Sequence, residues 1–291
     1  MKILAFDIGG TEIKYAFCDE SFNLTEKNSI PTNANEGGKR IIERIVEIIK
    51  GCSGIDRIGI STAGQVNSVT GEIIYATDSI PGYTGTKIKE IIEAETGIPT
   101  AVENDVNSAA IGEAVFGAAK GCGDFVCLTY GTGIGGAVFM NGKLFTGSSF
   151  SAGEFGHTVT HPGGKPCTCG GEGCYEAYAS AKALTDKVSK KLGREMNGRD
   201  VFASFDNAEV KTAVDEWIDE IVIGLKNLVY IFNPALIVAG GGIMNEEYIT
   251  DEINKRLQKQ LMKSFCGVKV KKALMGNDAN KLGAAYLASK L

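Results

Sequence analysis

The sequence predicts an α/β fold with mixed sheets flanked by helices, arranged as two similar lobes with a cleft between them. Short β-branched segments alternate along the chain with longer segments of helical periodicity, which is typical of this class. A strand, a glycine-rich turn and a second strand occur twice in this order, around Gly9 and around Gly131. The length of 291 residues corresponds to about two domains. Ligands bind preferentially between domains, so the cleft is the expected binding site.

The first half of the chain opens with three strands joined by tight turns. Residues 2–8 form an apolar run that leads into a glycine turn, and strands at 12–18 and 22–30 follow. Isoleucines at helical spacing predict a helix over 38–50. The remaining elements are a strand at 55–61, a helix at 86–96 that ends at Gly97 and Pro99, a strand at 100–103, and a helix at 106–116 that Asn104 and Asp105 cap.

The second half repeats this order of elements. They are a strand at 124–130, a glycine turn at 131–136, a strand at 137–141, a long helix at about 209–232, a strand at 235–239 followed by three glycines, a helix at 246–264, a strand at 268–271 and a helix at 281–290. We expect an N-terminal lobe of residues 1–118 that the final helix, 280–291, rejoins. Residues 119–279 form the expected C-terminal lobe.

Composition and charge exclude several classes of function. With 30 basic and 35 acidic residues the net charge is −5, which argues against a nucleic-acid partner because such a partner needs a basic face. The longest apolar stretch, 228–243, is broken by Asn233-Pro234 and three glycines, so it cannot span a membrane. Asp7 interrupts the first apolar run, and we expect no signal peptide. Five of the 8 cysteines are scattered among apolar neighbours, which predicts free thiols and a cytoplasmic location.

Two glycine-rich turns have the composition of phosphate-binding loops. Backbone N–H groups around Gly9 and Gly10, together with the Thr11 hydroxyl, can surround phosphate oxygens, and Asp7 at the strand end can hold Mg²⁺ or its waters. The second turn covers residues 131–136. A plain hairpin turn explains either loop taken alone, whereas equivalent places in two lobes favour phosphate binding. Neither turn is a Rossmann fingerprint or a P-loop, because a strand follows each and no Gly-Lys-Ser/Thr is present.

Asp105 is the candidate general base. The segment Glu103-Asn-Asp-Val-Asn107 places it at a strand-to-helix junction, where helix capping is the commonest role of such a residue. The functional interpretation has Asp105 accept a proton from a substrate hydroxyl while Asn104 holds a neighbouring hydroxyl. Both interpretations remain open from the local sequence.

Three cysteines and a histidine have the composition of a metal site. His157, Cys167, Cys169 and Cys174 lie within eighteen residues and supply the four tetrahedral ligands of a structural zinc ion. Such a closed site orders a loop, here 157–176, and carries out no chemistry. His161 is an alternative fourth ligand, and three free thiols are the alternative to a metal site.

Taken together, these motifs resemble those of the ROK family of bacterial sugar kinases. The segments that carry the resemblance are Asp7-Ile-Gly-Gly-Thr11, Glu103-Asn-Asp-Val-Asn107, Gly131-Thr-Gly-Ile-Gly-Gly136, Glu154-Phe-Gly-His157 and Cys167-Thr-Cys-Gly-Gly-Glu-Gly-Cys-Tyr-Glu176. They occur in order over nearly the whole chain, as far as the glycines 240–242. The resemblance implies an actin-like (ribonuclease H-like) ATPase fold, ATP and Mg²⁺ as cofactors, a structural Zn²⁺ and a homodimer.

The resemblance also implies a role for each matching residue. Asp105 takes the proton from a sugar hydroxyl, the one on C6. The sugar-binding positions are Gly64, Asn104, Glu154, His157 and Glu176. The positions near ATP are Asp7, Gly9, Gly10, Thr11, Lys14, Thr132, Gly133, Gly240 and Gly241. Zinc is held by His157, Cys167, Cys169 and Cys174.

The sugar itself stays open between two kinds. Residues 61–67 and 147–150 are similar to kinases of N-acetylmannosamine, whereas residues 80–83 are similar to the loop over the sugar in glucose-type members. A sugar-responsive regulator and a sugar-binding protein without catalysis are the alternative functions. Regulators of the family carry a DNA-binding segment before the core, while here the first strand begins at Lys2. The presence of Asp105 and of both glycine loops favours a kinase.

Overall fold

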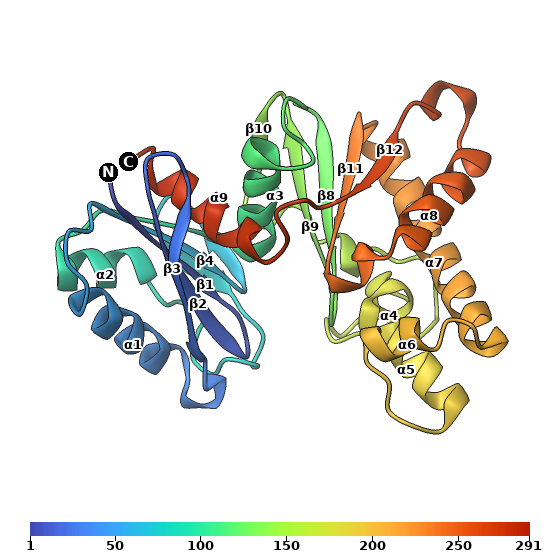
Figure 1. The fold of residues 1–291 in the computed structure, drawn as a ribbon, viewed down its shortest axis with the longest axis horizontal. Helices are drawn as coiled ribbons and strands as arrows, with labels where there is room; N and C mark the ends of the chain where they lie inside the picture. The colour runs from blue at the N-terminus through green and yellow to red at the C-terminus, as the bar shows by residue number, and fades with distance from the viewer. The chain divides into compact units, whose positions relative to one another are not determined.

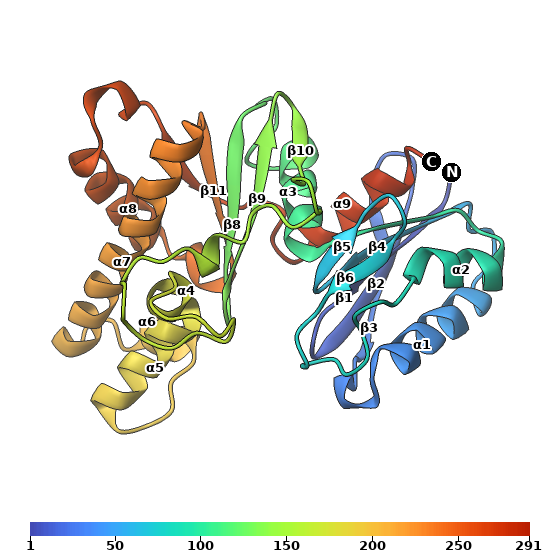
Figure 2. The ribbon, with the colours of Figure 1, turned by 180° about the vertical axis from the view of Figure 1, so that it is seen from behind.

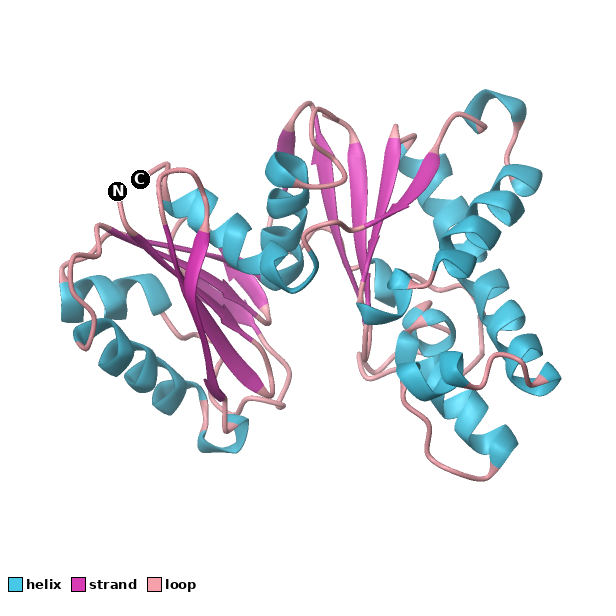
Figure 3. Cartoon of the chain, viewed as in Figure 1, coloured by secondary structure: helices cyan, strands magenta, loops and turns pink.

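The computed structural model describes residues 1–291, and they divide into two compact units, each with its own sheet and helices (Figure 3). Unit 1 comprises Met1–Lys120, Thr146–Ala152 and Asn277–Leu291, and unit 2 comprises Gly121–Phe145 and Gly153–Gly276. The sequence places the lobe boundaries after residues 118 and 279, within three residues of these divisions. It does not anticipate that the short segment Thr146–Ala152 groups with unit 1.

Unit 1 is built on a five-stranded mixed sheet with strand order β3-β2-β1-β4-β7. The strands are β1 (Ile3–Ile8), β2 (Glu12–Cys18), β3 (Leu24–Pro31), β4 (Arg57–Thr62) and β7 (Thr100–Asn104). The first three pair antiparallel, and β1, β4 and β7 run parallel. The carboxyl ends of β1, β4 and β7 therefore meet at one edge of this sheet.

Unit 2 repeats this topology with strand order β10-β9-β8-β11-β12. The strands are β8 (Phe125–Tyr130), β9 (Ile134–Met140), β10 (Lys143–Phe145), β11 (Leu236–Gly240) and β12 (Lys269–Lys272). Again the first three are antiparallel and the last two run parallel to the central strand. The two glycine turns join β1 to β2 and β8 to β9, so they occupy equivalent places, as the sequence predicts.

The two faces of the unit 1 sheet are covered by different helices (Figure 1). On β1, Leu4, Phe6 and Ile8 pack in one cluster with α1 (Gly38–Lys50) and α2 (Ile88–Thr96). The intervening residues Ile3 and Ala5 pack with α9 (Ala279–Ala288) near the chain end. This alternation follows from the two-residue period of a strand, and it explains why β1 is apolar on both faces.

Helix α9 packs on the sheet and on α3 (Asp105–Phe116) at backbone distance. A Cβ atom at Gly59 of β4 would lie 2.3 Å from the carbonyl oxygen of Ala284, and one at Gly283 would lie 1.8 Å from that of Ser108. Glycine is required at these positions because the neighbouring backbone occupies the space of a side chain. The chain terminus is thus an integral part of unit 1.

Replacing Gly59 by alanine is expected to destabilise the protein by about 1–3 kcal/mol, because the added methyl group overlaps the α9 backbone. Thermal or urea unfolding measures this loss. Gly267→Ala is the matched control, since a Cβ atom there meets nothing within 4 Å and its stability is expected to stay unchanged. Equal unfolding midpoints for Gly59→Ala and the wild type would contradict the close packing of α9.

Helices of unit 2 pack against α7 (Ala208–Phe232) (Figure 2). The Trp217 and Ile221 side chains of α7 are fully buried. The Asn207 side chain caps its first turn by accepting from the N–H groups of Glu209 and Val210. The helix ends at Asn233, which adopts a left-handed conformation before Pro234. The other helices of this unit are α4 (Glu176–Ala179), α5 (Ala181–Leu192), α6 (Gly198–Ala203) and α8 (Glu247–Gln260).

Some predicted elements differ from the structure. The helix predicted over 246–264 ends at Gln260, because Leu261 leaves the helical conformation, and residues 263–265 form a separate short turn. The hairpin β5 (Gln65–Asn67) and β6 (Glu72–Tyr75) has only three and four residues, and the sequence indicates only turns there. Helices α5 and α6 are also absent from the prediction. None of the helices combines the length and the apolar character needed to cross a lipid bilayer.

Candidate functional site

The parallel strands of unit 1 bring the predicted acidic residues to one sheet edge. Asp7 on β1 pairs with Ser61 on β4, and the next pair along β4 and β7 is Thr62 with Asn104. Asp105 follows Asn104 directly as the first residue of α3. The carboxylates of Asp7 and Asp105 therefore share this edge, although nearly a hundred residues separate them in the sequence.

Asn104, and not Asp105, caps α3. The Asn104 Oδ1 accepts hydrogen bonds from the N–H groups of Val106 (2.9 Å) and Asn107 (3.0 Å). Its Nδ2 donates to the Gly64 carbonyl (2.9 Å) and to Asp105 Oδ1 (2.9 Å). The amide thus positions Asp105 and the loop at Gly64, where φ is +96°. All its hydrogens are engaged inside the protein, so its contact with a sugar hydroxyl stays a prediction.

The Asp105 carboxylate lies in an environment that favours its protonated form. Burial raises the pKa of Asp105 to about 6, and the negative charge of Asp7 contributes to this increase. Hydrogen bonds from Val106 N–H and Asn104 act in the opposite direction. A carboxylate with a pKa near neutrality is a better proton acceptor than an ordinary aspartate. The environment is therefore suited to general-base chemistry.

Glu103 stabilises the junction between β7 and α3. Its side chain is 2% exposed, and its Oε1 accepts from the backbone N–H of Asn104 (2.8 Å) and from Asn107 Nδ2 (3.0 Å). Burial raises the pKa of Glu103 as well. This role of Glu103 is not predictable from the sequence, because a buried carboxylate and an exposed one have the same sequence signature.

The first glycine turn is a tight loop held from its side. The Gly9 N–H donates to the Glu12 carbonyl (3.0 Å), and Thr32 contacts the loop twice, through its hydroxyl to Gly9 O (2.6 Å) and its N–H to Thr11 O (2.9 Å). Gly10 and Thr11 are exposed at its tip. Lys14 lies further along β2, with Nζ 3.8 Å from the Glu12 carboxylate. The loop is thus held by hydrogen bonds from Thr32, and Gly10 and Thr11 are accessible to a ligand.

In unit 2, the second glycine turn and the glycines after β11 lie next to each other. Gly240 pairs with Thr129 across the parallel strands β11 and β8, and a Cβ atom at Gly241 would lie 2.2 Å from the Tyr130 carbonyl oxygen. Within the turn, Gly131 N–H donates to the Gly133 carbonyl (3.0 Å), and Thr132 is exposed. The carboxyl ends of β8 and β11 thus carry the predicted nucleotide-binding positions of this unit.

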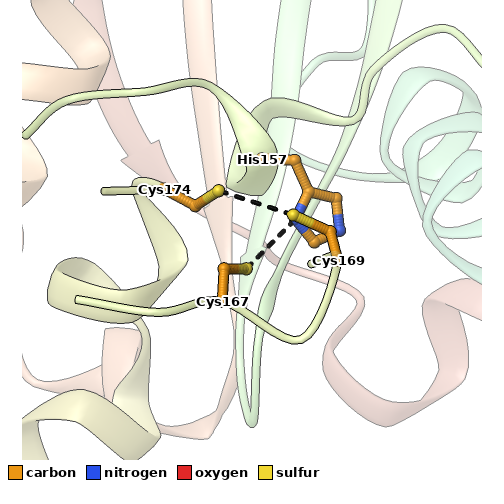
Figure 4. Close-up of side chains that lie close together, drawn as sticks. All are labelled: His157, Cys167, Cys169 and Cys174. Atoms are coloured by element: carbon orange, nitrogen blue, oxygen red, sulfur yellow. Dashed lines mark hydrogen bonds between the residues drawn. The ribbon is translucent and has the colours of Figure 1, made fainter. Parts of the chain in front are cut away.

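The predicted metal ligands of unit 2 come together in space (Figure 4). The ligand atoms of His157, Cys167, Cys169 and Cys174 all lie within 4.8 Å of one another. His157 Nδ1 is 3.6 Å from Cys167 Sγ, and Cys169 Sγ is 3.6 Å from Cys174 Sγ. A tetrahedral zinc ion with the usual Zn–S and Zn–N bonds separates its ligands by about 3.5–3.8 Å. The donor set and its spacing fit zinc.

His161, the alternative ligand, lies elsewhere. Its ring stacks on Tyr178 at 4.0 Å, and its Nε2 is 3.5 Å from the Glu220 carboxylate of α7. The Tyr178 hydroxyl in turn accepts from the N–H of Lys165 (2.7 Å). His161 therefore anchors the cysteine-containing loop to the helices, and the group of possible metal ligands contains His157 instead.

Glu176 connects this loop to the second glycine turn. Its Oε1 accepts from Cys167 Sγ (3.2 Å) and Thr168 Oγ1 (3.3 Å), while Oε2 accepts from the Ile134 N–H (3.3 Å). A Cβ atom at Gly133 would lie 2.5 Å from the same Oε2. Glu154 Oε2 lies 4.0 Å from His157 Nε2, the ring nitrogen that faces away from Cys167.

A buried tyrosine pair, which was not predicted from the sequence, supports Glu176. The hydroxyl of Tyr175 lies 3.0 Å from that of Tyr130 and donates to the Ile221 carbonyl (2.9 Å). A Cβ atom at Gly224 would overlap the Tyr175 ring at 2.3 Å. Tyr130 precedes the glycine turn and Tyr175 precedes Glu176. The contact between their hydroxyls therefore holds the start of the glycine turn close to the residue before Glu176.

The structure thus forms two sets of predicted residues, one in each unit. Asp7, Gly9, Gly10, Thr11, Lys14, Gly64, Asn104 and Asp105 belong to unit 1. Thr132, Gly133, Glu154, His157, Cys167, Cys169, Cys174, Glu176, Gly240 and Gly241 belong to unit 2. Ser61 and Asn280 are supporting residues that were not predicted, and their side chains donate to Asp7 Oδ1 at 3.3 and 2.9 Å. Their partners are distant in sequence, and no local pattern marks them.

Comparison with known proteins places the chain in a family. The ROK family model matches residues 3–291. An uncharacterized protein of Clostridium perfringens is 41% identical over 96% of this chain and 95% of its own length. A β-glucoside kinase of Listeria monocytogenes is 34% identical over 98% and 97%, respectively. The crystal structure of a ROK family glucokinase from Streptomyces griseus with glucose and AMPPNP has a TM-score of 0.87 at 29% identity, covering 100% of both chains.

These similarities extend over nearly the whole chain and confirm the predicted α/β fold with mixed sheets, the fold of ROK hexokinases. This chain belongs to the ROK family.

Proposed function

We propose that the protein is an ATP-dependent sugar kinase that transfers the γ-phosphoryl group of ATP to the C6 hydroxyl of a hexose or N-acetylhexosamine. The observation that carries the proposal is the Asp105 carboxylate, held by Asn104 and the first turn of α3 with its pKa raised to about 6. In the reaction Asp105 accepts the hydroxyl proton as the sugar oxygen bonds to the γ-phosphorus. The bond from that phosphorus to the β–γ bridging oxygen breaks, and ADP leaves.

The ATP phosphates are assigned to the two glycine turns. Gly10 and Thr11 are exposed at the tip of the first turn, and Thr132 is exposed in the second. Asp7 provides a carboxylate of the kind that binds Mg²⁺ together with substrate phosphates, so the donor set fits that ion. Magnesium, when bound, neutralises charge on the β- and γ-phosphates. Gly240 and Gly241 are assigned to the adenosine.

The sugar hydroxyls are assigned to Glu154, His157 and Glu176 in unit 2 and to Gly64 and Asn104 in unit 1. His157 turns Nδ1 toward the cysteines and Nε2 away from them, so one ring nitrogen suits zinc and the other a hydroxyl. Zinc would then fix the tautomer and the orientation of the ring. The proposed zinc ion is structural, because four protein ligands leave no open position.

The proposed sugar is tested by ADP release from Mg·ATP across a panel of sugars. The panel contains glucose, mannose, fructose, allose, N-acetylglucosamine and N-acetylmannosamine, together with cellobiose as a β-glucoside. We expect turnover with at least one of them, which also distinguishes a glucose-type from an N-acetylmannosamine-type kinase. Binding of a sugar without any ADP release would instead support a sugar-responsive regulator or a sugar-binding protein.

The activity is expected to fall below about pH 6. Asp105 acts as a base only when ionised, and its raised pKa of about 6 means that kcat/KM decreases about tenfold per pH unit below this value. A pH profile of kcat/KM from 4.5 to 9 measures the acid limb. An acid limb near pH 4, the value of an ordinary aspartate, would contradict the assigned environment of the base.

A homodimer and a cytoplasmic location complete the proposal. The dimer is an expectation from the family resemblance, and light scattering coupled to gel filtration measures it. We infer the location from the use of ATP and from the cysteines, none of which forms a disulfide. Three of them are assigned to zinc, and the other five are free thiols of the kind found in a reducing compartment.

A further inference from the structure

We propose that Asn280 is a positioning residue for phosphoryl transfer, whose side-chain amide orients the Asp7 carboxylate so that one carboxylate oxygen stays available to magnesium. The inference rests on the function proposed above. It concerns a residue of the last helix, 273 positions from Asp7 in the sequence.

The hydrogen bonds of the Asp7 side chain are asymmetric. Asn280 Nδ2 donates to Oδ1 at 2.9 Å, and Ser61 Oγ donates to the same oxygen at 3.3 Å. The second oxygen, Oδ2, accepts neither bond. Two neutral donors on one oxygen hold the plane of the carboxylate and leave its charge intact, so Oδ2 can serve a cation.

The two donors reach Asp7 by different routes. Ser61 is its register partner on the neighbouring parallel strand, and the sheet itself therefore sets the distance. Asn280 is the second residue of α9, which crosses the sheet face beneath β1 and β4. Ser61 forms the longer bond, so Asn280 is the stronger constraint on the orientation of Asp7.

The position of Asn280 is fixed because α9 is packed at backbone distance at three points, two on α3 and one on β4. A Cβ atom at Gly112 would lie 2.4 Å from the Ala279 carbonyl oxygen, next to Asn280. Equivalent overlaps at Gly283 and Gly59 involve the backbone of Ser108 and of Ala284. A side chain supported in this way is preorganised, as a positioning residue must be.

The same packing relates Asn280 to the base. Helix α9 packs along α3, which begins at Asp105, and the close contacts at Gly112 and Gly283 join these two helices. The packed pair α3 and α9 therefore positions both carboxylates. Asn280 of α9 binds the Asp7 carboxylate, and Asp105 is itself the first residue of α3. Loss of the amide removes one of the two hydrogen bonds to Asp7 and leaves Asp105 and its cap in place.

The proposal is tested by calorimetric titration of AMPPNP in excess Mg²⁺ and in EDTA. In the wild type Mg²⁺ is expected to strengthen AMPPNP binding. In Asn280→Ala the increase in affinity caused by Mg²⁺ is expected to be about tenfold smaller than in the wild type. A tenfold loss is the usual cost of removing a hydrogen-bond partner of a metal ligand. The affinity of the variant in EDTA stays unchanged, which shows that the site is folded. In steady-state assays kcat falls about 10–100-fold while the sugar KM is retained.

Asn277→Ala is the matched control, because its side chain is exposed three residues before Asn280. It is expected to keep the full metal-dependent increase. An equal increase in Asn280→Ala and the wild type would overturn the positioning role, and so would an equal loss of affinity with and without Mg²⁺. A wild-type chain that binds AMPPNP with no gain from Mg²⁺ would overturn the proposal together with the magnesium role of Asp7.

Discussion

Replacing Asp105 by asparagine is expected to lower kcat for sugar phosphorylation by about 10²–10⁴-fold, the usual contribution of a general base. The sugar KM is expected to change little, because asparagine has nearly the same shape. Its side-chain oxygen can still accept from the Val106 N–H and from Asn104 Nδ2, which hold Asp105 Oδ1 at 2.9 Å. The variant therefore removes the proton acceptor without removing the structure around it.

The same variant is expected to be more stable than the wild type at pH 8. The pKa of Asp105 is about 6 in the folded protein and near 3.8 in an unfolded chain, so the folded state binds the proton more tightly. This contribution to stability is present below about pH 4 and is lost as the pH rises through 6. Asparagine avoids the cost of the charged form, so the free energy of unfolding is expected to rise by about 1–2 kcal/mol. The gain is limited to this amount because the side chain is partly exposed and solvent screens part of the effect.

A loss of activity together with a gain of stability would show that the Asp105 carboxylate serves catalysis at a cost in folding stability. Unfolding of both proteins at pH 4 and pH 8, followed by fluorescence, measures the gain and its disappearance in acid. Asp206→Asn serves as the control, because this aspartate is exposed in the other unit and neither quantity is expected to change. Wild-type turnover by Asp105→Asn would exclude Asp105 as the base.

Loss of the proposed zinc site is the second large effect that we expect. Cys174→Ser is expected to abolish the binding of one zinc ion per chain and to raise the sugar KM by at least about tenfold. Cys174 is buried and pairs across a bridge with Val159, so its ligand position connects both sides of the loop. Without the metal, His157 loses its fixed orientation, and Glu176 loses the order of its partners Cys167 and Thr168. A lower melting temperature is expected as well.

Cys266→Ser is the matched control for the metal cluster. It removes an exposed thiol of the same unit outside the cluster, and zinc content, KM and stability are expected to be unchanged. Metal analysis by mass spectrometry and steady-state kinetics measure the two variants side by side. A metal-free preparation with wild-type KM and melting temperature would rule out the structural zinc ion.

The fold was predictable because its main signals are local. A strand, a glycine turn and a strand form one continuous segment, and the structure repeats that segment as β1–β2 and β8–β9 with identical sheet topology. The cysteines are likewise close in sequence, and their approach within 4.8 Å agrees with the spacing argument. The choice of His157 over His161 required the fold, because only the packing on Tyr178 and Glu220 removes His161 from the cluster.

The supporting residues were not predictable, because their contacts join segments that are distant in the sequence. Asn280 contacts Asp7 across 273 positions, and Thr32 holds the first glycine turn through bonds that nothing in its own segment marks. The roles within Asn104-Asp105 were ambiguous because either residue can cap a helix. In the structure Asn104 caps the helix, and the Asp105 carboxylate is the group whose pKa is raised.

The most direct test of the account is ³¹P NMR of Mg·ATP incubated with the sugar that the panel identifies. For the wild type we predict a sugar 6-phosphate resonance that grows in equal amount with ADP, and for Asp105→Asn we predict neither. Release of inorganic phosphate without sugar phosphate, or equal sugar phosphate from both proteins, would contradict phosphoryl transfer to a sugar with Asp105 as the base.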